Sequence, residues 1–243
     1  MANFFPEMSL FDENGKRLYL TDTERRLFLE ASKVETRENR VFCSVLHYTG
    51  CRLSEALELT PRQISMQDQA VIIRTLKKRK HDKQGREKKP QYRSVPVPPS
   101  VVDFFDLVFD LRRRQHKNND QPFWKMSRTS AWRMVKKVME RAGISGPQAT
   151  PKGLRHGFGV AMVTSDNPLP LHILADLMGH SSTATTEIYT RVLAGEKQKM
   201  VLNAWKGGVS RNPRKFRHRV TQYSYHHQLP FKNILPCILT GFR

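Results

Sequence analysis

Residues 49–57 read Thr-Gly-Cys-Arg-Leu-Ser-Glu-Ala-Leu and place an arginine at a glycine turn, directly before a short helix. Gly50 breaks an apolar helical pattern that runs through residues 41–46. An arginine at a helix start opposes the helix dipole, so Arg52 needs either the carboxylate of Glu55, one turn later, or a bound anion. Two interpretations stay open: a surface ion pair, or a guanidinium that holds a phosphate.

The patterns on both sides of this stretch predict a mainly α chain with a small antiparallel β-sheet, an α+β fold. Thr21 and Glu24 form a capping-box pattern at the start of the first helix. Two short runs, 70–76 and 92–97, are rich in β-branched residues and predict a pair of strands. The expected helices cover residues 22–34, a stretch through 41–46, 53–59, 99–117, 128–142, 151–165, 170–178, 182–190 and 192–205.

The chain is strongly basic, with 42 Lys and Arg against 22 Asp and Glu, a net charge of +20 and a pI near 10.3. Residues 207–243 hold seven of the basic residues and no acidic one, so their removal lowers the charge from +20 to +13. Such an excess favours a polyanionic partner, because each cation on a phosphate releases counterions. Nucleic acid is therefore the expected partner, rather than a membrane surface.

Cysteine usage and hydropathy argue against a secreted or membrane-spanning protein. Cys43, Cys51 and Cys237 cannot all pair and show no CxxC spacing, so neither a disulfide framework nor a cysteine zinc site is expected. No stretch approaches 18 apolar residues, and the first residues lack the features of a secretory signal. We expect a cytoplasmic, nucleoid-associated protein with no membrane partner.

A second basic motif, Pro-Lys-Gly-Leu-Arg-His at residues 151–156, reads as a helix entry with proline in the first turn. Lys152 and Arg155 are three residues apart and share a helix face, where a phosphate could sit. A solvated basic face is the alternative. We expect His156, next in the chain, to be a core histidine that is hydrogen-bonded to backbone.

A third motif joins a histidine and a tyrosine. Residues 178–182, Met-Gly-His-Ser-Ser, predict a helix end, a turn and a new helix start, where His180 could simply cap the preceding helix. Tyr189 follows nine residues after His180. A phenol, with a pKa of roughly 10, is a poor nucleophile unless cations stabilise the charge that builds during attack. A packed core tyrosine is the alternative.

In this order and spacing, the three motifs resemble those of the tyrosine recombinase (phage integrase) family, over about residues 20–205. Residues 49–57 resemble the first-arginine box of the family, and residues 153–156 resemble the second. Leu177-Met-Gly-His180, followed by Tyr189, resembles the third. The resemblance implies the fold of the family's catalytic domain. The catalytic residues that it implies are Arg52, Lys77, Lys152, Arg155, His180 and Tyr189.

The resemblance also implies the chemistry, a DNA strand transesterification without a metal or nucleotide cofactor. The two arginines would hold nonbridging phosphate oxygens while Tyr189 attacks phosphorus, forming a 3′-phosphotyrosyl bond and freeing a 5′-hydroxyl. Lys77, or else Lys78, in the basic hairpin tip expected at residues 77–89, would protonate the leaving oxygen. His180 would hydrogen-bond the phosphate. The implied protein is a site-specific recombinase of double-stranded DNA, acting as a homotetramer on paired sites.

Two departures from the family pattern affect these expectations. The family usually has histidine where this chain has Lys152, and a lysine amine is ordinarily protonated at neutral pH. Lys152 is therefore either a proton relay or a second phosphate clamp. Family members commonly carry a core-binding domain first, whereas residues 1–20 read here as an irregular lead-in to a catalytic domain at 21–206. Residues 207–243 are expected to be a disordered basic tail or a readthrough end.

Two other functions stay open beside the recombinase. One is a type IB topoisomerase-like enzyme, which would break and rejoin strands without paired sites. The other is a DNA-binding relic of a recombinase without catalytic activity. The expected helix at 192–205 would either dock into a neighbouring protomer or pack on its own domain.

Overall fold

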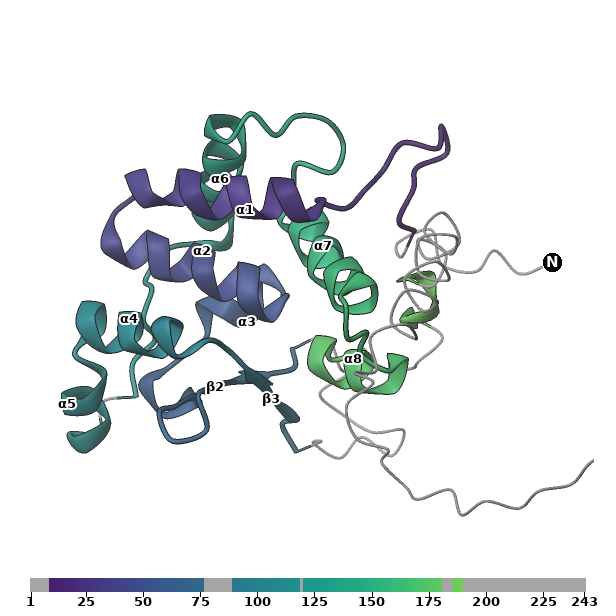
Figure 1. The fold of residues 1–243 in the computed structure, drawn as a ribbon. Coiled ribbons are helices and arrows are strands. Elements are labelled where there is room, and N and C mark those ends of the chain that lie inside the picture. Colours follow the sequence, from purple (N-terminus) through teal and green to yellow (C-terminus); the bar gives the residue numbers. More distant parts are fainter. Residues whose placement is uncertain (1–8, 77–88, 119, 181–184, 190–243) are drawn as a thin grey trace, which may run out of the picture. The chain divides into compact units, whose positions relative to one another are not determined.

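The computed structural model describes residues 9–76, 89–118, 120–180 and 185–189. The tip of the basic hairpin, with Lys77 and Lys78, lies outside the described residues, as do the expected helix 192–205 and the tail 207–243. The described part is mainly helical with a small three-stranded antiparallel sheet (Figure 1). The predicted α+β fold class is confirmed.

The described elements follow the predicted order, except that the strand Ile64–Ser65 was not predicted and that the described residues 185–189 of the helix expected at 182–190 contain a 3₁₀ turn instead. The α-helices are α1 (Asp22–Ala31), α2 (Arg37–Thr49), α3 (Leu53–Leu57), α4 (Pro99–Phe109), α5 (Leu111–His116), α6 (Arg128–Arg141), α7 (Pro151–Thr164) and α8 (Leu171–Met178). The strands are β1 (Ile64–Ser65), β2 (Ala70–Arg74) and β3 (Tyr92–Pro96). Short 3₁₀ turns cover Ser32–Val34, Pro61–Gln63 and Glu187–Tyr189.

Local signals fix several helix ends. The hydroxyl of Thr21 accepts a hydrogen bond from the backbone N–H of Glu24, and the Glu24 carboxylate accepts one from the N–H of Thr21, as the capping box predicts. Gly50 ends α2 in the left-handed conformation, with φ of 57°. The single helix expected at 99–117 is wrong, because Asp110 also adopts a left-handed conformation and separates α4 from α5.

The sheet has the order β1–β2–β3 and is antiparallel throughout. In its register Val71 lies opposite Val95, and Ile73 lies opposite Arg93. The three apolar residues are buried, and so is Arg93. The sheet packs through β2 against α3 and through β3 against α8. A charged side chain therefore occupies an interior position of a strand, between the sheet and two helices.

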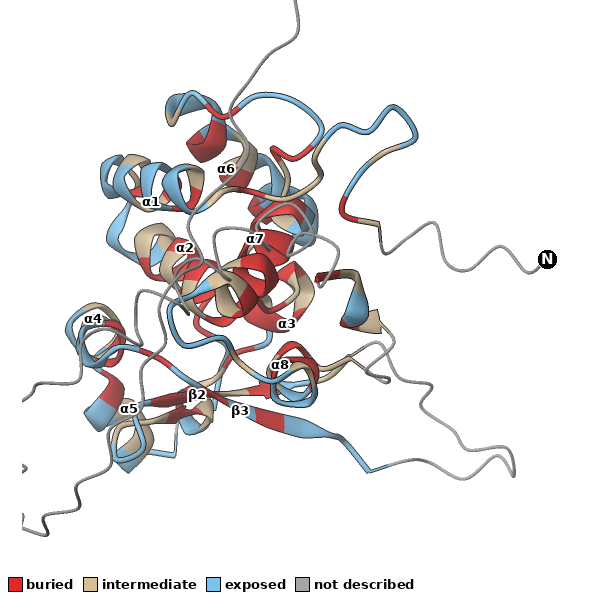
Figure 2. Cartoon of the chain, turned by 45° about the vertical axis from the view of Figure 1, so that its right-hand side comes forward, coloured by how far each residue is buried: buried red, intermediate tan, exposed pale blue. Residues whose placement is uncertain are grey.

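Helix α7 is packed on several sides, by α1, α2, α6 and α8. Figure 2 shows its buried residues in red, and nine of its positions, from Gly153 to Val163, are buried. Two glycines permit this close packing. A Cβ at Gly153 would lie 1.9 Å from the carbonyl oxygen of Gln148, and a Cβ at Gly157 would lie 2.5 Å from that of Leu20. Backbone segments thus approach α7 more closely than a side chain would allow.

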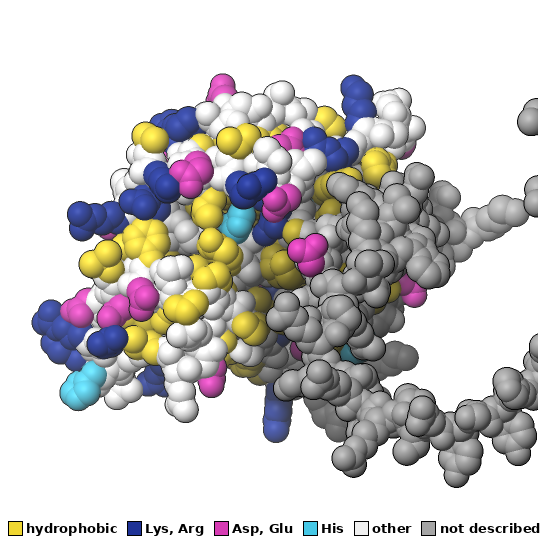
Figure 3. All heavy atoms as spheres, viewed as in Figure 1, with side chains coloured by type: hydrophobic (Ala, Val, Ile, Leu, Met, Phe, Trp, Pro, Cys, Tyr) yellow, Lys and Arg dark blue, Asp and Glu magenta, His cyan; other side chains and the backbone are white. Residues whose placement is uncertain are grey.

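Two hydrophobic clusters stabilise the described part of the chain. The larger one includes the edge-to-face aromatic pair of Phe42 and Trp124, with ring centroids 5.0 Å apart. The smaller one gathers Phe158, Met178 and Tyr189 around the end of α7. On the face shown in Figure 3, Lys and Arg side chains are interspersed with Asp and Glu side chains. No helix among the described residues is long and apolar enough to span a membrane.

Candidate active site

Arg52 stands at the N-terminus of α3 and is paired with a carboxylate of the same helix. Its Nη1 lies 2.8 Å from Oε1 of Glu55, and its backbone N–H donates to Oε2 of Glu55 at 3.0 Å. The side chain of Arg52 is 28% exposed, while that of Glu55 is fully buried. The ion pair expected from the sequence is therefore present. It is not a surface pair, however, because its carboxylate belongs to the interior.

Glu55 has a second basic partner that the sequence analysis missed. Nη2 of Arg93 lies 2.6 Å from Oε2 of Glu55. Burial alone would raise the pKa of the Glu55 carboxyl, but the hydrogen bond and charge of Arg93, helped by Arg52, hold that pKa below its usual value. One buried carboxylate thus orients two guanidinium groups.

Arg155 is a buried cation that connects two turns. Its Nη1 donates to the carbonyl of Gly50 at 2.6 Å, and its Nη2 donates to the carbonyl of Met178 at 2.7 Å. Burial, followed by repulsion from Arg52, lowers the pKa of its guanidinium to about 10. Among the described residues it has no ion pair with a carboxylate. Arg155 therefore contributes positive charge that no ion-paired carboxylate neutralises.

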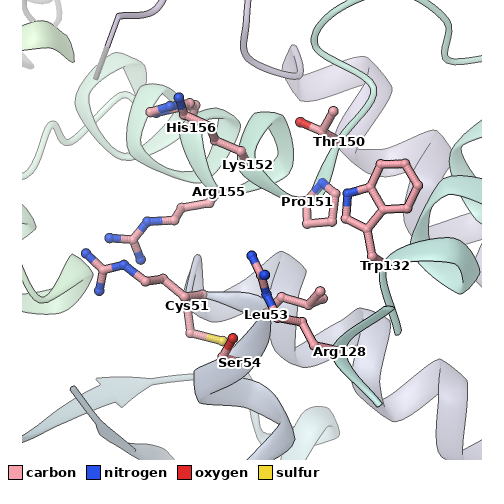
Figure 4. A pocket seen from close by; sticks show the side chains of 11 residues that line it. Cys51, Leu53, Ser54, Arg128, Trp132, Thr150, Pro151, Lys152, Arg155 and His156 are labelled. Atoms are coloured by element: carbon pink, nitrogen blue, oxygen red, sulfur yellow. The ribbon is translucent and has the colours of Figure 1, made fainter. Parts of the chain in front are cut away.

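A pocket of about 620 Å³, called here the basic pocket, lies where α3, α6 and α7 begin. Four of its residues are cationic: Arg52, Arg128, Lys152 and Arg155. The other lining residues are Cys51, Leu53, Ser54, Trp132, Thr150, Pro151 and His156 (Figure 4). The N-termini of the two long helices α6 and α7 and four side-chain cations make this pocket suited to an anion.

Tyr189 is fully buried, and its hydroxyl oxygen lies within hydrogen-bond distance of Nδ1 of His156, at 3.1 Å. Burial raises the pKa of Tyr189 to about 12, against the opposing effect of Arg155 and Arg52. The ring fits against a glycine, because a Cβ at Gly159 would lie 2.4 Å from it. The prediction that His156 bonds to backbone is wrong. It is a core histidine, but its partner is a tyrosine hydroxyl 33 residues away.

His180 follows the left-handed Gly179 that ends α8. Its backbone N–H donates to the carbonyl of Ala175 and caps the helix, and its Nδ1 lies 2.9 Å from Oγ1 of Thr186. Its ring is parallel to that of Tyr189, with centroids 6.5 Å apart. Nε2 of His180 is buried and has no hydrogen-bond partner among the described residues. This nitrogen is available to a ligand that reaches it.

The predicted site residues fall into two adjoining groups. Arg52, Lys152 and Arg155 line the basic pocket, and Tyr189 and His180 are not among its lining residues. His156 joins the groups, since it lines the pocket and hydrogen-bonds Tyr189. Lys77 and Lys78 lie outside the described residues. Within the described ranges, no group of three or more His, Cys, Asp or Glu side chains could hold a metal ion.

Three buried histidines make the folded chain sensitive to acid. Burial is the largest cause that lowers the pKa values of His47, His156 and His180 to about 3, whereas histidine in an unfolded chain titrates near 6.5. As pH falls, the unfolded state therefore binds these protons before the folded state does. The contribution of the neutral histidines to the free energy of unfolding is complete above about pH 6.5 and is lost as pH falls towards 3. We expect the free energy of unfolding to fall by up to about 1.4 kcal/mol per pH unit for each histidine.

Urea unfolding between about pH 7.5 and pH 5 measures this slope. The variant His47→Gln should take up one proton fewer on unfolding, so its free energy of unfolding should depend less steeply on pH. The exposed His172 provides a control for the loss of an imidazole at the surface, and His172→Gln should change the free energy of unfolding at pH 7.5 by less than about 0.5 kcal/mol. An identical slope in wild type and His47→Gln would contradict the assignment of His47 as a buried neutral group.

The sequence matches the model of the phage integrase family over residues 18–196. The tyrosine recombinase XerA of Pyrococcus furiosus is 28% identical over 195 residues, which make up 76% of this chain and 61% of that relative. The chain spans less than two thirds of the length of the first curated relatives that it matches.

Solved structures give the same result for the fold. The crystal structure of XerA recombinase has a TM-score of 0.59 and 26% identity, and the match covers 80% of this chain and 66% of that one. The XerH recombinase bound to palindromic difH substrate, in a post-cleavage complex, has a TM-score of 0.61 at 20% identity, over 83% of this chain and 57% of that one. With the family model matching most of the sequence, the chain belongs to the phage integrase family of tyrosine recombinases.

Proposed function

We propose that the chain is a site-specific DNA recombinase that breaks and rejoins strands through a covalent 3′-phosphotyrosyl bond to Tyr189. One observation carries the proposal. The basic pocket gathers cations from three helices, and its wall includes His156, the hydrogen-bond partner of the Tyr189 hydroxyl. Uncompensated positive charge next to a tyrosine is the arrangement that attack on a phosphodiester requires.

The arginines bind the scissile phosphate in this proposal. The guanidinium groups of Arg52 and Arg155 hold the nonbridging oxygens and offset the charge of the pentacovalent transition state. Arg155 suits this role because its bonds to two carbonyls fix its position without neutralising its charge. Glu55 fixes the direction of Arg52 through an ion pair, and it shares its carboxylate with Arg93.

The other residues form and break the bonds. The phenolic oxygen of Tyr189 bonds to phosphorus while the bond from phosphorus to the 5′-oxygen breaks, and Lys77 or Lys78 gives that oxygen its proton. Nε2 of His180 binds a phosphate oxygen. Lys152 either adds positive charge, with the tyrosine proton passing directly to a phosphate oxygen or to water, or it relays that proton to one of them. The phosphotyrosyl bond keeps the energy of the broken one, so rejoining to another strand requires no further cofactor.

The proposed partner is double-stranded DNA. The net charge of +20 supports it, and so does the complex of XerH with its difH substrate. Exchange between two duplexes requires four active sites, so we propose a homotetramer assembled on paired sites. Such a protein would act on nucleoid DNA in the cytoplasm and would recombine the DNA of a mobile element.

The resting state differs from the reacting one in this proposal. Tyr189 is buried with a pKa of about 12, and the pKa of its partner His156 is about 3, so the proton stays on the phenol. DNA binding has to bring a phosphate to the arginines and change the surroundings of the tyrosine before it reacts. A protonated, enclosed nucleophile does not attack unrelated phosphates.

A pool of nicked duplexes with randomised arms tests the proposal on the full chain. The nick lets the short cleaved fragment diffuse away, so the covalent product cannot revert. We expect protein–DNA adducts that survive detergent and whose DNA shares a common sequence. Protease digestion and mass spectrometry should find the nucleotide remnant on the peptide that contains Tyr189.

Other results would replace the proposal by one of its alternatives. Selective retention of DNA without any adduct would identify a non-catalytic DNA-binding protein. Relaxation of a supercoiled plasmid that lacks the selected sequence would identify topoisomerase-like activity. An adduct on a peptide without Tyr189 would contradict the assignment of the nucleophile.

A further inference from the structure

Arg93 lies at the meeting point of three segments that carry proposed catalytic residues. Its side chain is 3% exposed, and all three of its guanidinium nitrogens donate hydrogen bonds. Nη2 donates to Glu55 at 2.6 Å, Nε to the carbonyl of Leu177 at 2.9 Å, and Nη1 to the hydroxyl of Thr75 at 3.1 Å. Each acceptor belongs to a different part of the chain.

The first contact acts on Arg52. Glu55 gives one carboxylate oxygen to Nη1 of Arg52, and the other accepts from Nη2 of Arg93 and from the backbone N–H of Arg52. The carboxylate is therefore held from both sides. Arg93 is the more buried of the two arginines, and it fixes the plane of the Glu55 carboxylate. That carboxylate in turn orients Arg52, which lines the basic pocket.

The second contact acts on the turn that leads to His180. Arg93 binds the carbonyl of Leu177 in the last turn of α8, and its Nη1 would lie 2.8 Å from a Cβ at Gly179. Gly179 has φ of 63° and no side chain, so the guanidinium fits directly under the turn. The neighbouring carbonyl of Met178 binds Arg155. Two buried arginines thus hold the same helix end.

The third contact acts on the base of the basic hairpin. Thr75 directly follows β2, and its backbone N–H donates to the carbonyl of Gln91, the residue before β3, at 2.8 Å. Its hydroxyl accepts from Arg93. Lys77 comes two residues later in the sequence. Thr75, at the base of the hairpin, is therefore bound to Arg93, which also holds the carboxylate that orients Arg52.

Stability alone gives little reason for an arginine at this position. Replacing a buried ion pair by well-packed apolar residues is often neutral or stabilising, and the residue opposite Arg93 in the sheet is Ile73. What an apolar side chain cannot supply is three donors in one rigid plane. Position 93 has three acceptors from three segments arranged around that plane.

We propose that Arg93 is a positioning residue for strand cleavage, which sets Arg52, the His180 turn and the base of the lysine-bearing hairpin in one fixed arrangement. Its side chain is 3% exposed and all three of its guanidinium nitrogens already have acceptors, so it acts through these neighbours and does not touch the phosphate. This inference rests on the proposed recombinase function. It adds a residue that the three sequence motifs do not contain.

The test compares Arg93→Lys with Arg25→Lys in the full chain. Arg25, in α1, is also a buried arginine. Its guanidinium donates to the carbonyl of His47 in α2, and it does not line the basic pocket. On a nicked duplex selected as above, Arg93→Lys should lower the single-turnover cleavage rate by about 10- to 100-fold. Its affinity for the duplex should stay within about threefold, since no phosphate contact is lost. Arg25→Lys should cleave at the wild-type rate.

A second measurement does not depend on activity. Because Arg93 lies under the turn before His180, Arg93→Lys should change the imidazole ¹⁵N chemical shifts of His180, and Arg25→Lys should leave them unchanged. Equal cleavage rates in the two variants, or unchanged His180 shifts in Arg93→Lys, would overturn the proposal. If the wild-type chain forms no adduct, the proposed function fails, and the His180 shifts alone then decide the role of Arg93.

Discussion

Tyr189→Phe is expected to abolish the covalent adduct and to lower the cleavage rate by more than about 10⁴-fold, as loss of a catalytic nucleophile does. Phenylalanine keeps the ring that fills the space beside Gly159 and removes only the oxygen that would bond to phosphorus. The loss therefore reports on chemistry and not on packing. Single-turnover reactions on a selected nicked duplex, separated on denaturing gels, measure the effect.

The folded state should survive this substitution. The variant loses one hydrogen bond, from the hydroxyl to His156, which corresponds to about 1 kcal/mol of stability. Affinity for the duplex should stay within about threefold. Tyr48→Phe, which removes a phenolic oxygen from α2, serves as the control and should form adduct like wild type. A normal adduct yield from Tyr189→Phe would mean that another side chain is the nucleophile.

Glu55→Ala is expected to lower the free energy of unfolding by about 3–5 kcal/mol, because it leaves a buried guanidinium without its counter-charge. Arg93 lies 2.6 Å from Glu55, and the two side chains are 3% and 0% exposed. Arg52 loses its partner as well. Urea unfolding at neutral pH measures the change.

Glu58→Ala is a matched control three residues further along. Glu58 lies 3.8 Å from Arg74, and both side chains are about half exposed, so its loss should cost less than about 1 kcal/mol. The double variant Glu55→Leu, Arg93→Met removes both buried charges and should recover part of the stability. A change below about 1 kcal/mol in Glu55→Ala would show that Arg93 is not held by this carboxylate.

Much of the fold follows from signals that act within one turn of chain. The capping box of Thr21 and Glu24, the glycine stop at Gly50 and the β-branched run of β2 each act locally, and the structure has them where the sequence predicts them. The pairing of Arg52 with Glu55 belongs to the same class, because both residues lie on one turn of α3.

The features that sequence analysis missed depend on distant partners. β1 has only two residues and exists because β2 pairs with it. The partners of Arg93 lie 18, 38 and 84 residues away, so no local pattern distinguishes it from a surface arginine in a strand. The bond between His156 and Tyr189 spans 33 residues. One sequence signal for Arg93 was available: a basic residue at an inward position of an otherwise alternating strand.

The ring of Tyr189 rests in space that exists because residue 159 has no side chain. Two positions 30 residues apart are therefore coupled sterically: a variant that acquires even a methyl group at residue 159 must move the ring of Tyr189. In such a variant the tyrosine side chain would have to occupy another position. The missing side chain at this position of α7 is thus what allows the tyrosine to be buried inside its own domain.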